Sequence, residues 1–249
     1  MGQLEGKVAL ITGGSRGIGL ATAELFVQEG AKVVIVGNKA DNLKAALAKL
    51  GSNATGDIVD ISDLAALDHL YNFIAQTHGH LDIIVANAGI CNLSSLVDAT
   101  EDQFDRHFDT NTKGTFFTVQ KSLPLLRDGA TIVLISSIAQ YKGVPGYHIY
   151  AGSKAAVRAF ARNWALELKD RNIRVNCLSP GPTDTPMAFE MGVPTEALPA
   201  MLEQLQQVIP LGRLGRPSEQ AEAILFLASD RSSFITGADL CTDGGMAQI

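Results

Sequence analysis

The chain has 249 residues, of which 46% are hydrophobic and 18% charged, and its formal net charge is -6. This length and composition suit one folded domain with a sizeable core. The acidic balance and the lack of a Lys/Arg cluster disfavour a nucleic-acid partner. The N-terminal apolar run is too short for a signal peptide, or for a membrane span of about 20 apolar residues. We therefore expect a soluble, cytoplasmic protein with no membrane partner.

The cysteines and histidines show no spacing that suits a metal site or a disulfide framework. Cys91, Cys177 and Cys241 are far apart and form no CxxC pair. We expect them to be unreactive thiols in a reducing compartment. No metal centre is expected either, because no ligand spacing relates the five histidines, which are His69, His78, His80, His107 and His148.

Short apolar runs alternate with longer amphipathic stretches from the N-terminus onward. The runs are rich in Val and Ile and too short for helices, which indicates strands buried on both faces. They lie at 8–11, 33–36, 83–85, 132–135 and 175–178, with a last one near 238–241. Amphipathic stretches that suit helices lie at 21–30, 41–50, 64–79 and 217–230. The alternation predicts an α/β fold: a doubly wound, Rossmann-like parallel sheet of about seven strands with helices on both faces.

The regular alternation stops between residues 179 and 217. This stretch is rich in proline and carries scattered large apolar side chains, whereas a linker between domains would be more polar. We therefore expect one domain over residues 1–249, with residues 186–210 forming a lid over a substrate pocket. The apolar side chains of this lid are Met187, Phe189, Met191, Leu198, Met201 and Leu202.

A glycine-rich stretch, TGGSRGIG at 12–19, stands between the first predicted strand and the first predicted helix. A parallel sheet binds ligands at the carboxyl ends of its strands, where a glycine turn lets backbone N–H groups meet a pyrophosphate. The spacing Gly13-x-x-x-Gly17-x-Gly19 differs from GxGxxG, but the strand before it and the helix after it match that context. We therefore expect a dinucleotide site here.

The end of the second predicted strand bears on which nicotinamide cofactor binds. NAD sites place an Asp or Glu there to bond the ribose 2′-OH. Here Asn38 and Lys39 follow the strand, and Asp41 is expected to cap the next helix instead. Arg16 and Lys39 together suit a 2′-phosphate, with Ser15 and Asn38 donating hydrogen bonds. NADP(H) is therefore favoured over NAD(H), although two surface charges without this role, or use of both cofactors, stay open.

A phenol and an ammonium occur four residues apart in YAGSK, at Tyr150 and Lys154. A helix places residues i and i+4 on one face, so both side chains point the same way. A free phenol has a pKa of about 10, and a nearby ammonium lowers that pKa towards neutrality. Ser137 ends an earlier predicted strand, where its hydroxyl could hold a substrate oxygen beside the phenol. These three residues suit proton transfer to a carbonyl oxygen.

Six motifs occur in the order and spacing of the short-chain dehydrogenase/reductase family. They are TGGSRGIG (12–19), ANAG (86–89), NTKG (111–114), ISS (135–137), YAGSK (150–154) and SPGPTDT (179–185). Because they extend over nearly the whole chain, the sequence closely resembles that family. Ala86 is a departure, since the second motif usually reads NNAG.

The resemblance implies a role for each matching residue. Tyr150 is the general acid in carbonyl reduction, Ser137 bonds the carbonyl oxygen, and Lys154 lowers the Tyr150 pKa and bonds the nicotinamide ribose. Asn111 holds a water that links Lys154 to a proton relay. The expected cofactor contacts, beside Tyr150 and Lys154, are Gly13, Ser15, Arg16, Gly17, Ile18, Gly19, Asn38, Lys39, Asp60, Ile61, Asn87, Ala88, Gly89, Pro180, Gly181, Thr183 and Thr185.

The expected function is hydride transfer between NADP(H) and a ketone or secondary alcohol, with an apolar lid that suits a lipophilic substrate. One alternative is a 3-oxoacyl-acyl-carrier-protein reductase. Its acidic carrier would need a basic docking surface, for which the candidates are Lys121, Arg127, Arg171 and Arg174. Another alternative is an NADP(H)-binding sensor or scaffold without catalysis. The resemblance also implies a homotetramer.

Overall fold

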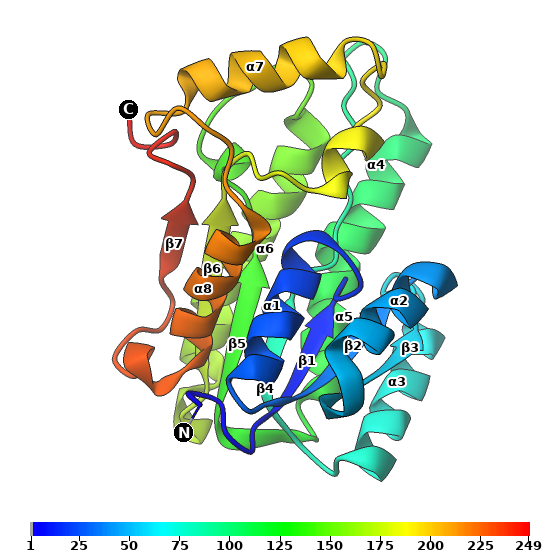
Figure 1. Cartoon of the computed structure of the whole chain (residues 1–249), viewed down its shortest axis with the longest axis vertical. Coiled ribbons are helices and arrows are strands. Elements are labelled where there is room, and N and C mark those ends of the chain that lie inside the picture. Colours follow the sequence, from blue (N-terminus) through cyan, green and yellow to red (C-terminus); the bar gives the residue numbers. More distant parts are fainter. Residues whose placement is uncertain (1) are drawn as a thin grey trace.

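The structure is a computed structural model that describes residues 2–249 (Figure 1). In this range seven strands form one parallel sheet, in the order β3-β2-β1-β4-β5-β6-β7. The strands are β1 (Val8–Thr12), β2 (Lys32–Gly37), β3 (Ala54–Ile58), β4 (Leu81–Ala86), β5 (Leu126–Ile135), β6 (Arg174–Pro180) and β7 (Asp239–Thr242). The predicted doubly wound parallel sheet is confirmed.

Helices cover both faces of the sheet (Figure 1). Those over one face are α1 (Gly17–Gln28), α2 (Ala40–Leu50) and α8 (Pro217–Ala228). Those over the other face are α3 (Leu64–Thr77), α5 (Thr115–Ser122) and α6 (His148–Glu167), and α4 (Glu101–His107) packs on α6. No helix within residues 2–249 is both long enough and apolar enough to cross a bilayer.

The central strands bury alternate residues on opposite faces of the sheet. In β1, Val8 and Leu10 belong to the core that contains residues of α3, α5 and α6. Ala9 and Ile11 belong to the core that contains residues of α1, α2 and α8. Because both faces of the sheet are covered, the stretch from Val8 to Ile11 is apolar without a polar break, which explains such runs in the sequence.

The edge strand β3 was not among the apolar runs, and the structure shows why. Its sequence, ATGDI, is only half-buried at Ala54 to Gly56 and exposed at Asp57 and Ile58. β3 lies at the edge of the sheet and pairs with β2 alone. Its side chains are therefore less covered than those of the central strands, and its sequence is less apolar.

The start of α2 also differs from the prediction. Lys39 precedes the first helical residue, and Asp41 lies inside the first turn rather than capping the helix. A carboxylate there still suits the positive N-terminal end of the helix dipole.

The proline-rich stretch passes over the carboxyl ends of the strands, at the top of Figure 1. It contains a short 3₁₀ turn, η5 (Pro186–Glu190), and a helix, α7 (Leu198–Val208). Pro199 lies in the first turn of α7, where no backbone N–H is needed for the helix. The residues expected to form a lid are therefore partly helical.

Candidate functional site

The glycine turn meets the end of β4 where the order of strands reverses. The Thr12 hydroxyl, at the end of β1, accepts hydrogen bonds from the N–H groups of Asn87 and Ala88, both at 3.0 Å. The Asn87 amide donates to the carbonyls of Thr12 at 2.9 Å and Gly13 at 3.2 Å. Ala86 therefore leaves the hydrogen bonds of Asn87 in place. Thr12 was not among the predicted site residues, because its partners lie about 75 residues away along the chain.

The turn packs too closely for side chains at two of its glycines. Gly13 has a φ of +62°, a left-handed conformation that glycine adopts without strain. A Cβ at Gly19 would lie 2.2 Å from the Gly13 carbonyl oxygen and 2.6 Å from Nδ2 of Asn87. At these two positions the turn therefore presents backbone without side chains. The turn leads directly into the N-terminus of α1 at Gly17.

A cavity of about 170 Å³ follows this turn along the ends of β1, β2 and β4. The predicted cofactor contacts that line it are Gly13, Ser15, Arg16, Gly17, Ile18, Asn38, Asp60, Ile61, Asn87, Ala88, Gly89 and Thr185. Bare backbone, a helix N-terminus and a guanidinium are groups that bind phosphates, so these residues fit a dinucleotide. The predicted contacts Gly19 and Lys39 do not line this cavity.

A second cavity, of about 220 Å³, adjoins the first and shares residues such as Ile18, Asn87 and Thr185 with it. Ser137, Tyr150 and Lys154 line this second cavity, and so do the predicted contacts Pro180, Gly181 and Thr183. Most of its remaining wall is apolar and consists of Ile135, Ile138, Ala139, Val144, Met187, Ala188, Met191, Met201, Leu202, Leu205, Leu214 and Met246.

The two neighbouring serines after β5 have different partners. The Ser136 hydroxyl donates to the Lys154 carbonyl at 2.9 Å, which ties the end of β5 to α6. The Ser137 hydroxyl instead accepts from the Ala139 N–H at 3.2 Å, and it lies close enough to Tyr150 to lower the pKa of the phenol. Ser137 is therefore the serine next to the phenol, as the spacing from Tyr150 predicts.

Burial has the largest influence on the pKa values of Tyr150 and Lys154. It raises the pKa of the phenol, against the hydrogen bond from Ser137, which lowers it. Burial also lowers the pKa of Lys154 to about 8. The Lys154 ammonium donates to the Ile135 carbonyl at 2.8 Å and lies 5.9 Å from the centre of the Tyr150 ring. The direction for Tyr150 is thus opposite to the lowering expected from Lys154.

Asn111 lies behind the cavities rather than in their walls. It is fully buried in η2 (Phe108–Gly114), a π-helical segment between α4 and α5. Its amide accepts from the Ile90 N–H at 2.8 Å and donates to the Ile90 carbonyl and the Ser153 hydroxyl, both at 3.0 Å. Asn111 thereby ties α6 to the loop after β4. Its expected role in holding a water stays a prediction.

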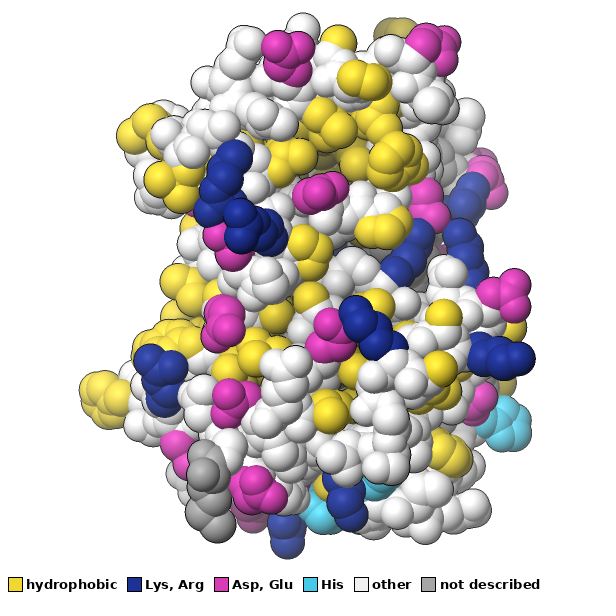
Figure 2. Space-filling model, in the orientation of Figure 1, with side chains coloured by type: hydrophobic (Ala, Val, Ile, Leu, Met, Phe, Trp, Pro, Cys, Tyr) yellow, Lys and Arg dark blue, Asp and Glu magenta, His cyan; other side chains and the backbone are white. Residues whose placement is uncertain are grey.

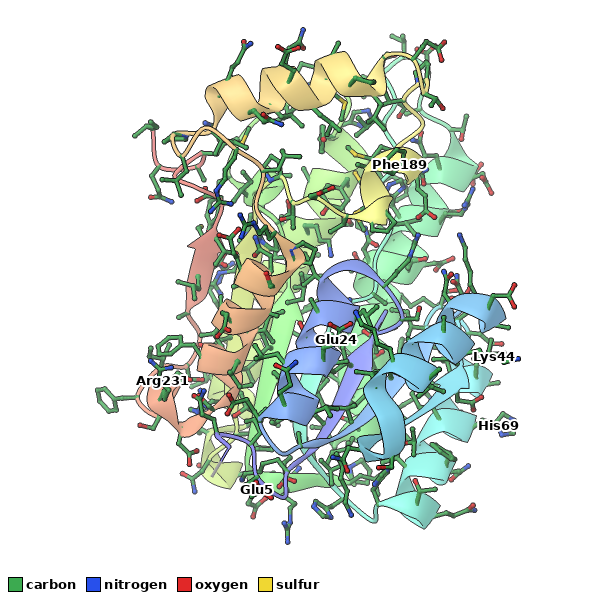
Figure 3. All side chains as sticks on the ribbon, viewed as in Figure 1. Glu5, Glu24, Lys44, His69, Phe189 and Arg231 are labelled. Carbon is green, nitrogen blue, oxygen red and sulfur yellow. The ribbon has the colours of Figure 1, made fainter. Side chains whose placement is uncertain are left out.

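The lid presents some of its expected side chains to the second cavity and not others. Met187, Met191, Met201 and Leu202 line the cavity, and Figure 2 shows apolar side chains gathered beneath α7. The expected lining role of Phe189 is wrong: its side chain is 70% exposed on η5 (Figure 3). Leu198 is buried but is not among the residues that line the cavity.

Arg16, which lines the first cavity, and Lys39 were predicted from the sequence to act together, and both approach one carboxylate. Between them is the carboxylate of Glu190, at the end of η5. Arg16 Nη1 and Nη2 donate to the two carboxylate oxygens at 2.6 and 2.5 Å, and Lys39 Nζ lies 3.1 Å from one of them. Nothing in the sequence indicated Glu190, which is 174 residues from Arg16.

Cys91, within the stretch 90–93 that the sequence places beside the pocket, also lines the second cavity. Burial raises the pKa of its thiol to about 12, so it stays protonated and unreactive at neutral pH. All three cysteines are free thiols. Within the described range, no three His, Cys, Asp or Glu side chains gather to hold a metal ion.

The chain is similar to known oxidoreductases over almost its whole length. Residues 13–247 match the family model described as enoyl-(acyl carrier protein) reductase. An oxidoreductase of Sarocladium schorii is 43% identical, over 99% of this chain and 98% of its own. The 3-oxoacyl-acyl-carrier-protein reductase of Thermotoga maritima is 41% identical, over 98% of this chain and 99% of its own.

Two further comparisons extend the likeness to another activity and to a solved structure. The NADP-dependent (R)-specific alcohol dehydrogenase of Lentilactobacillus kefiri is 37% identical, over 98% of this chain and 97% of its own. A short-chain dehydrogenase/reductase structure from Brucella melitensis, titled glucose/ribitol dehydrogenase, superposes with a TM-score of 0.92. It is 31% identical and covers 99% of both chains.

Proposed function

This chain belongs to the short-chain dehydrogenase/reductase family and is an oxidoreductase, and we propose that it transfers hydride between NADP(H) and a lipophilic ketone or secondary alcohol. One observation carries the proposal. Ser137, Tyr150 and Lys154 lie in the wall of a largely apolar cavity that adjoins the glycine-lined cavity. A carbonyl group bound there can reach the serine hydroxyl and the protonated phenol, while its hydrocarbon part contacts methionine and leucine side chains.

In the proposed mechanism, Ser137 donates a hydrogen bond to the carbonyl oxygen and polarises the carbonyl group. NADPH, when bound, supplies the hydride that the carbonyl carbon accepts. Tyr150 gives its phenolic proton to the oxygen, so that the alcohol forms and the tyrosine is left as a phenolate. The buried Lys154 ammonium stabilises that phenolate, although in the resting state burial keeps the phenol protonated.

Arg16 and Lys39 support the choice of NADP(H) over NAD(H). They approach one anionic group together, and a 2′-phosphate is an anion of suitable size for that pair. The residue directly after β2 is Asn38, so no carboxylate stands there for the ribose 2′-OH. The NADP-dependent relative from Lentilactobacillus kefiri is consistent with this choice.

The test is an absorbance assay of cofactor oxidation, with NADPH or NADH and a panel of alkyl and aryl ketones, sugars, 2-keto acids and an acetoacetyl thioester. We expect the fastest turnover with NADPH and apolar ketones. Highest rates on sugars or 2-keto acids would exclude a lipophilic substrate, and a preference for NADH would exclude the role of Arg16 and Lys39.

A 3-oxoacyl-acyl-carrier-protein reductase is the second candidate, favoured by the matching family model and the Thermotoga maritima relative. The four cationic side chains considered for docking an acidic carrier already form ion pairs or hydrogen bonds within this chain. Lys121, Arg127 and Arg171 pair with carboxylates of Asp68, Asp82 and Asp128. Arg174, at the start of β6, bonds internal oxygens of the α8–β7 connection. Activity on acetoacetyl thioesters that exceeds activity on free ketones by orders of magnitude would support this candidate.

We further propose a domain organisation, a cellular compartment and an oligomeric state for the enzyme. Residues 1–249 act as one catalytic domain, residues 186–210 act as its substrate lid, and the three free thiols suit the cytoplasm. Four chains assemble through α4 and α6, whose exposed apolar side chains include Phe104 and Leu166. Light scattering after size exclusion should give about four times the 26.4 kDa chain mass.

A further inference from the structure

Glu190 occupies the position between Arg16 and Lys39 in a way that resembles a bound anion. Its two oxygens accept from the two terminal nitrogens of Arg16, which is the paired geometry that guanidinium forms with carboxylate or phosphate. The contacts with Arg16 and Lys39 hold the pKa of Glu190 down at about 2, so the carboxylate is charged at any physiological pH. Within residues 2–249 no other carboxylate pairs with Arg16 or Lys39.

The same residue is anchored to the second cavity through its backbone. The Glu190 carbonyl accepts from Nδ2 of Asn92 at 2.7 Å, and the next carbonyl, of Met191, accepts from the Leu93 N–H at 2.9 Å. Met187 and Met191, on either side of Glu190, line the cavity that contains Tyr150. The Glu190 side chain thus connects the wall of the substrate cavity to the rim of the cofactor cavity.

We propose that Glu190 is an internal competitor for the 2′-phosphate of NADP(H), and that its displacement releases the lid. This inference rests on the proposed cofactor. A 2′-phosphate carries a charge of about -2 near neutral pH, against -1 for the carboxylate, so it takes over Arg16 and Lys39. The 2′-hydroxyl of NAD(H) is neutral and leaves Glu190 in place. The residue therefore sets how strongly the enzyme discriminates between the two cofactors, and it couples that choice to the lid.

The exposure of the three side chains indicates how much Glu190 should weaken binding of the 2′-phosphate. The side chains of Arg16, Lys39 and Glu190 are 34%, 57% and 41% exposed, so solvent screens their attraction. An ion pair of this kind changes a dissociation constant by about fivefold, with the paired Arg16 geometry at the upper end of what exposed pairs contribute.

The test compares binding of 2′,5′-ADP and 5′-AMP by calorimetry, in wild type, Glu190→Gln and Glu196→Gln. Glu196 is an exposed lid carboxylate, and its substitution removes the same charge without touching Arg16. In Glu190→Gln we expect 2′,5′-ADP to bind about fivefold more tightly and 5′-AMP to change by less than twofold. Glu196→Gln should change neither ligand. Unchanged or weaker binding of 2′,5′-ADP by Glu190→Gln would overturn the proposal.

Hydrogen exchange tests the release of the lid. In wild type, 2′,5′-ADP should raise amide exchange in residues 188–193 relative to 5′-AMP, whereas in Glu190→Gln the two ligands should give the same exchange. Equal exchange with both ligands in wild type would overturn the coupling. These readouts need no turnover, so a failed carbonyl assay leaves them intact. If wild type binds both nucleotides equally, the NADP assignment fails, while a gain in Glu190→Gln would still identify Glu190 as the competitor.

Discussion

At the scale of single residues, Tyr150 is distinguished from its neighbour Tyr147 by its partners. Both phenols line the second cavity, and their rings lie 6.1 Å apart. Burial raises the pKa of Tyr147 to about 12, and it has no hydrogen bond to Ser137. Tyr150 has Ser137 beside it and Lys154 one helical turn away, so of the two phenols only Tyr150 has the neighbours that the proposed mechanism needs.

Tyr150→Phe should therefore lower kcat by about 10²- to 10⁴-fold, which is the usual contribution of a positioned general acid. The reduction is measured as NADPH oxidation with the best ketone of the panel. Tyr147→Phe is the matched control and should keep kcat within about tenfold, as expected of a wall residue. Binding of 2′,5′-ADP should be unchanged in both variants. Equal losses in the two variants would contradict the assignment of Tyr150.

Lys154 predicts a pH dependence of stability. Its pKa is about 8 in the folded state, against an ordinary value of 10.5. Between these two pH values the unfolded chain binds a proton at this lysine that the folded chain has lost, so stability rises with pH there. Below pH 8 both states are charged, and the penalty for burying the ammonium is fully present. The side chain is 4% exposed, so the gain up to pH 10.5 is about 2–3 kcal/mol.

Urea unfolding at pH 7.5 and pH 10 measures this effect. Other groups also titrate in the interval, so wild type is compared with Lys154→Met, which has a side chain of similar length but no charge. The free energy of unfolding of wild type should rise relative to that of Lys154→Met as the pH increases. A difference that stays constant or falls would show that the Lys154 pKa is not lowered by burial.

At the scale of elements, the turn between β1 and α1 depends on its glycines for space. Gly19→Ala should displace the turn, because the added Cβ would meet the Gly13 carbonyl at 2.2 Å. We expect a loss of about 1–3 kcal/mol in the free energy of unfolding and at least tenfold weaker binding of 2′,5′-ADP. Gly152→Ala, in the exposed part of α6, is the control, since its Cβ would lie 3.8 Å from the nearest atom, Cζ of Phe108. It should be neutral or stabilising by up to about 1 kcal/mol, and similar losses in both variants would contradict the argument.

The proposed lid, residues 186–210, is another segment whose side chains differ in where they lie. Met201, on α7, lines the second cavity, whereas Phe189, on η5, is 70% exposed. Met201→Ala should raise KM for an apolar ketone by about five- to tenfold, because the substrate loses an apolar contact. Phe189→Ala should leave KM within about twofold. An effect of Phe189→Ala as large as that of Met201→Ala would show that η5 turns inward when substrate binds.

At the scale of the whole molecule, a polar cluster around the buried carboxylate of Asp239 joins the last strand to the rest of the sheet. The Asp239 carboxylate, at the start of β7, accepts from Ser179 of β6 at 2.7 Å and from Gln140 and Tyr141 at 2.8 and 2.5 Å. Arg158 of α6 approaches it to 3.4 Å, and the Asp239 and Arg158 side chains are only 4% and 14% exposed. The cluster thus connects β7, β6, α6 and the segment that follows Ser137.

Asp239→Asn should lower the free energy of unfolding by about 2–4 kcal/mol, because it leaves Arg158 buried without its counter-ion. Chemical unfolding measures the change. Asp128→Asn is the control, since Asp128 pairs with Arg171 but is 74% exposed, and such a pair contributes at most about 1 kcal/mol. Equal effects of the two substitutions would mean that the cluster is not a stabilising connection.

The sequence by itself determined the parts of this protein that depend on local pattern. The central strands contain short apolar runs because helices cover both faces of the sheet, so β1, β2, β4, β5 and β6 could be predicted from the sequence. The glycine turn and the pair Tyr150 and Lys154 were readable because each needs only a few residues at fixed spacing along one turn or one helix. Arg16 and Lys39 were predicted as a pair because no carboxylate follows β2, where NAD sites have one.

Only the tertiary structure decided what depends on residues far apart or on burial. The edge strand β3 has no apolar run, since its outer side has no neighbour, and the outward direction of Phe189 depends on how the lid packs. Burial, which no short stretch of sequence reveals, reversed the expected direction of the Tyr150 pKa. Glu190 reaches Arg16 and Lys39 across 174 and 151 residues, because the lid folds back over the carboxyl ends of the strands. Local pattern thus indicated the residues of the proposed site, and the path of the chain decided that the Glu190 carboxylate lies against Arg16 and Lys39.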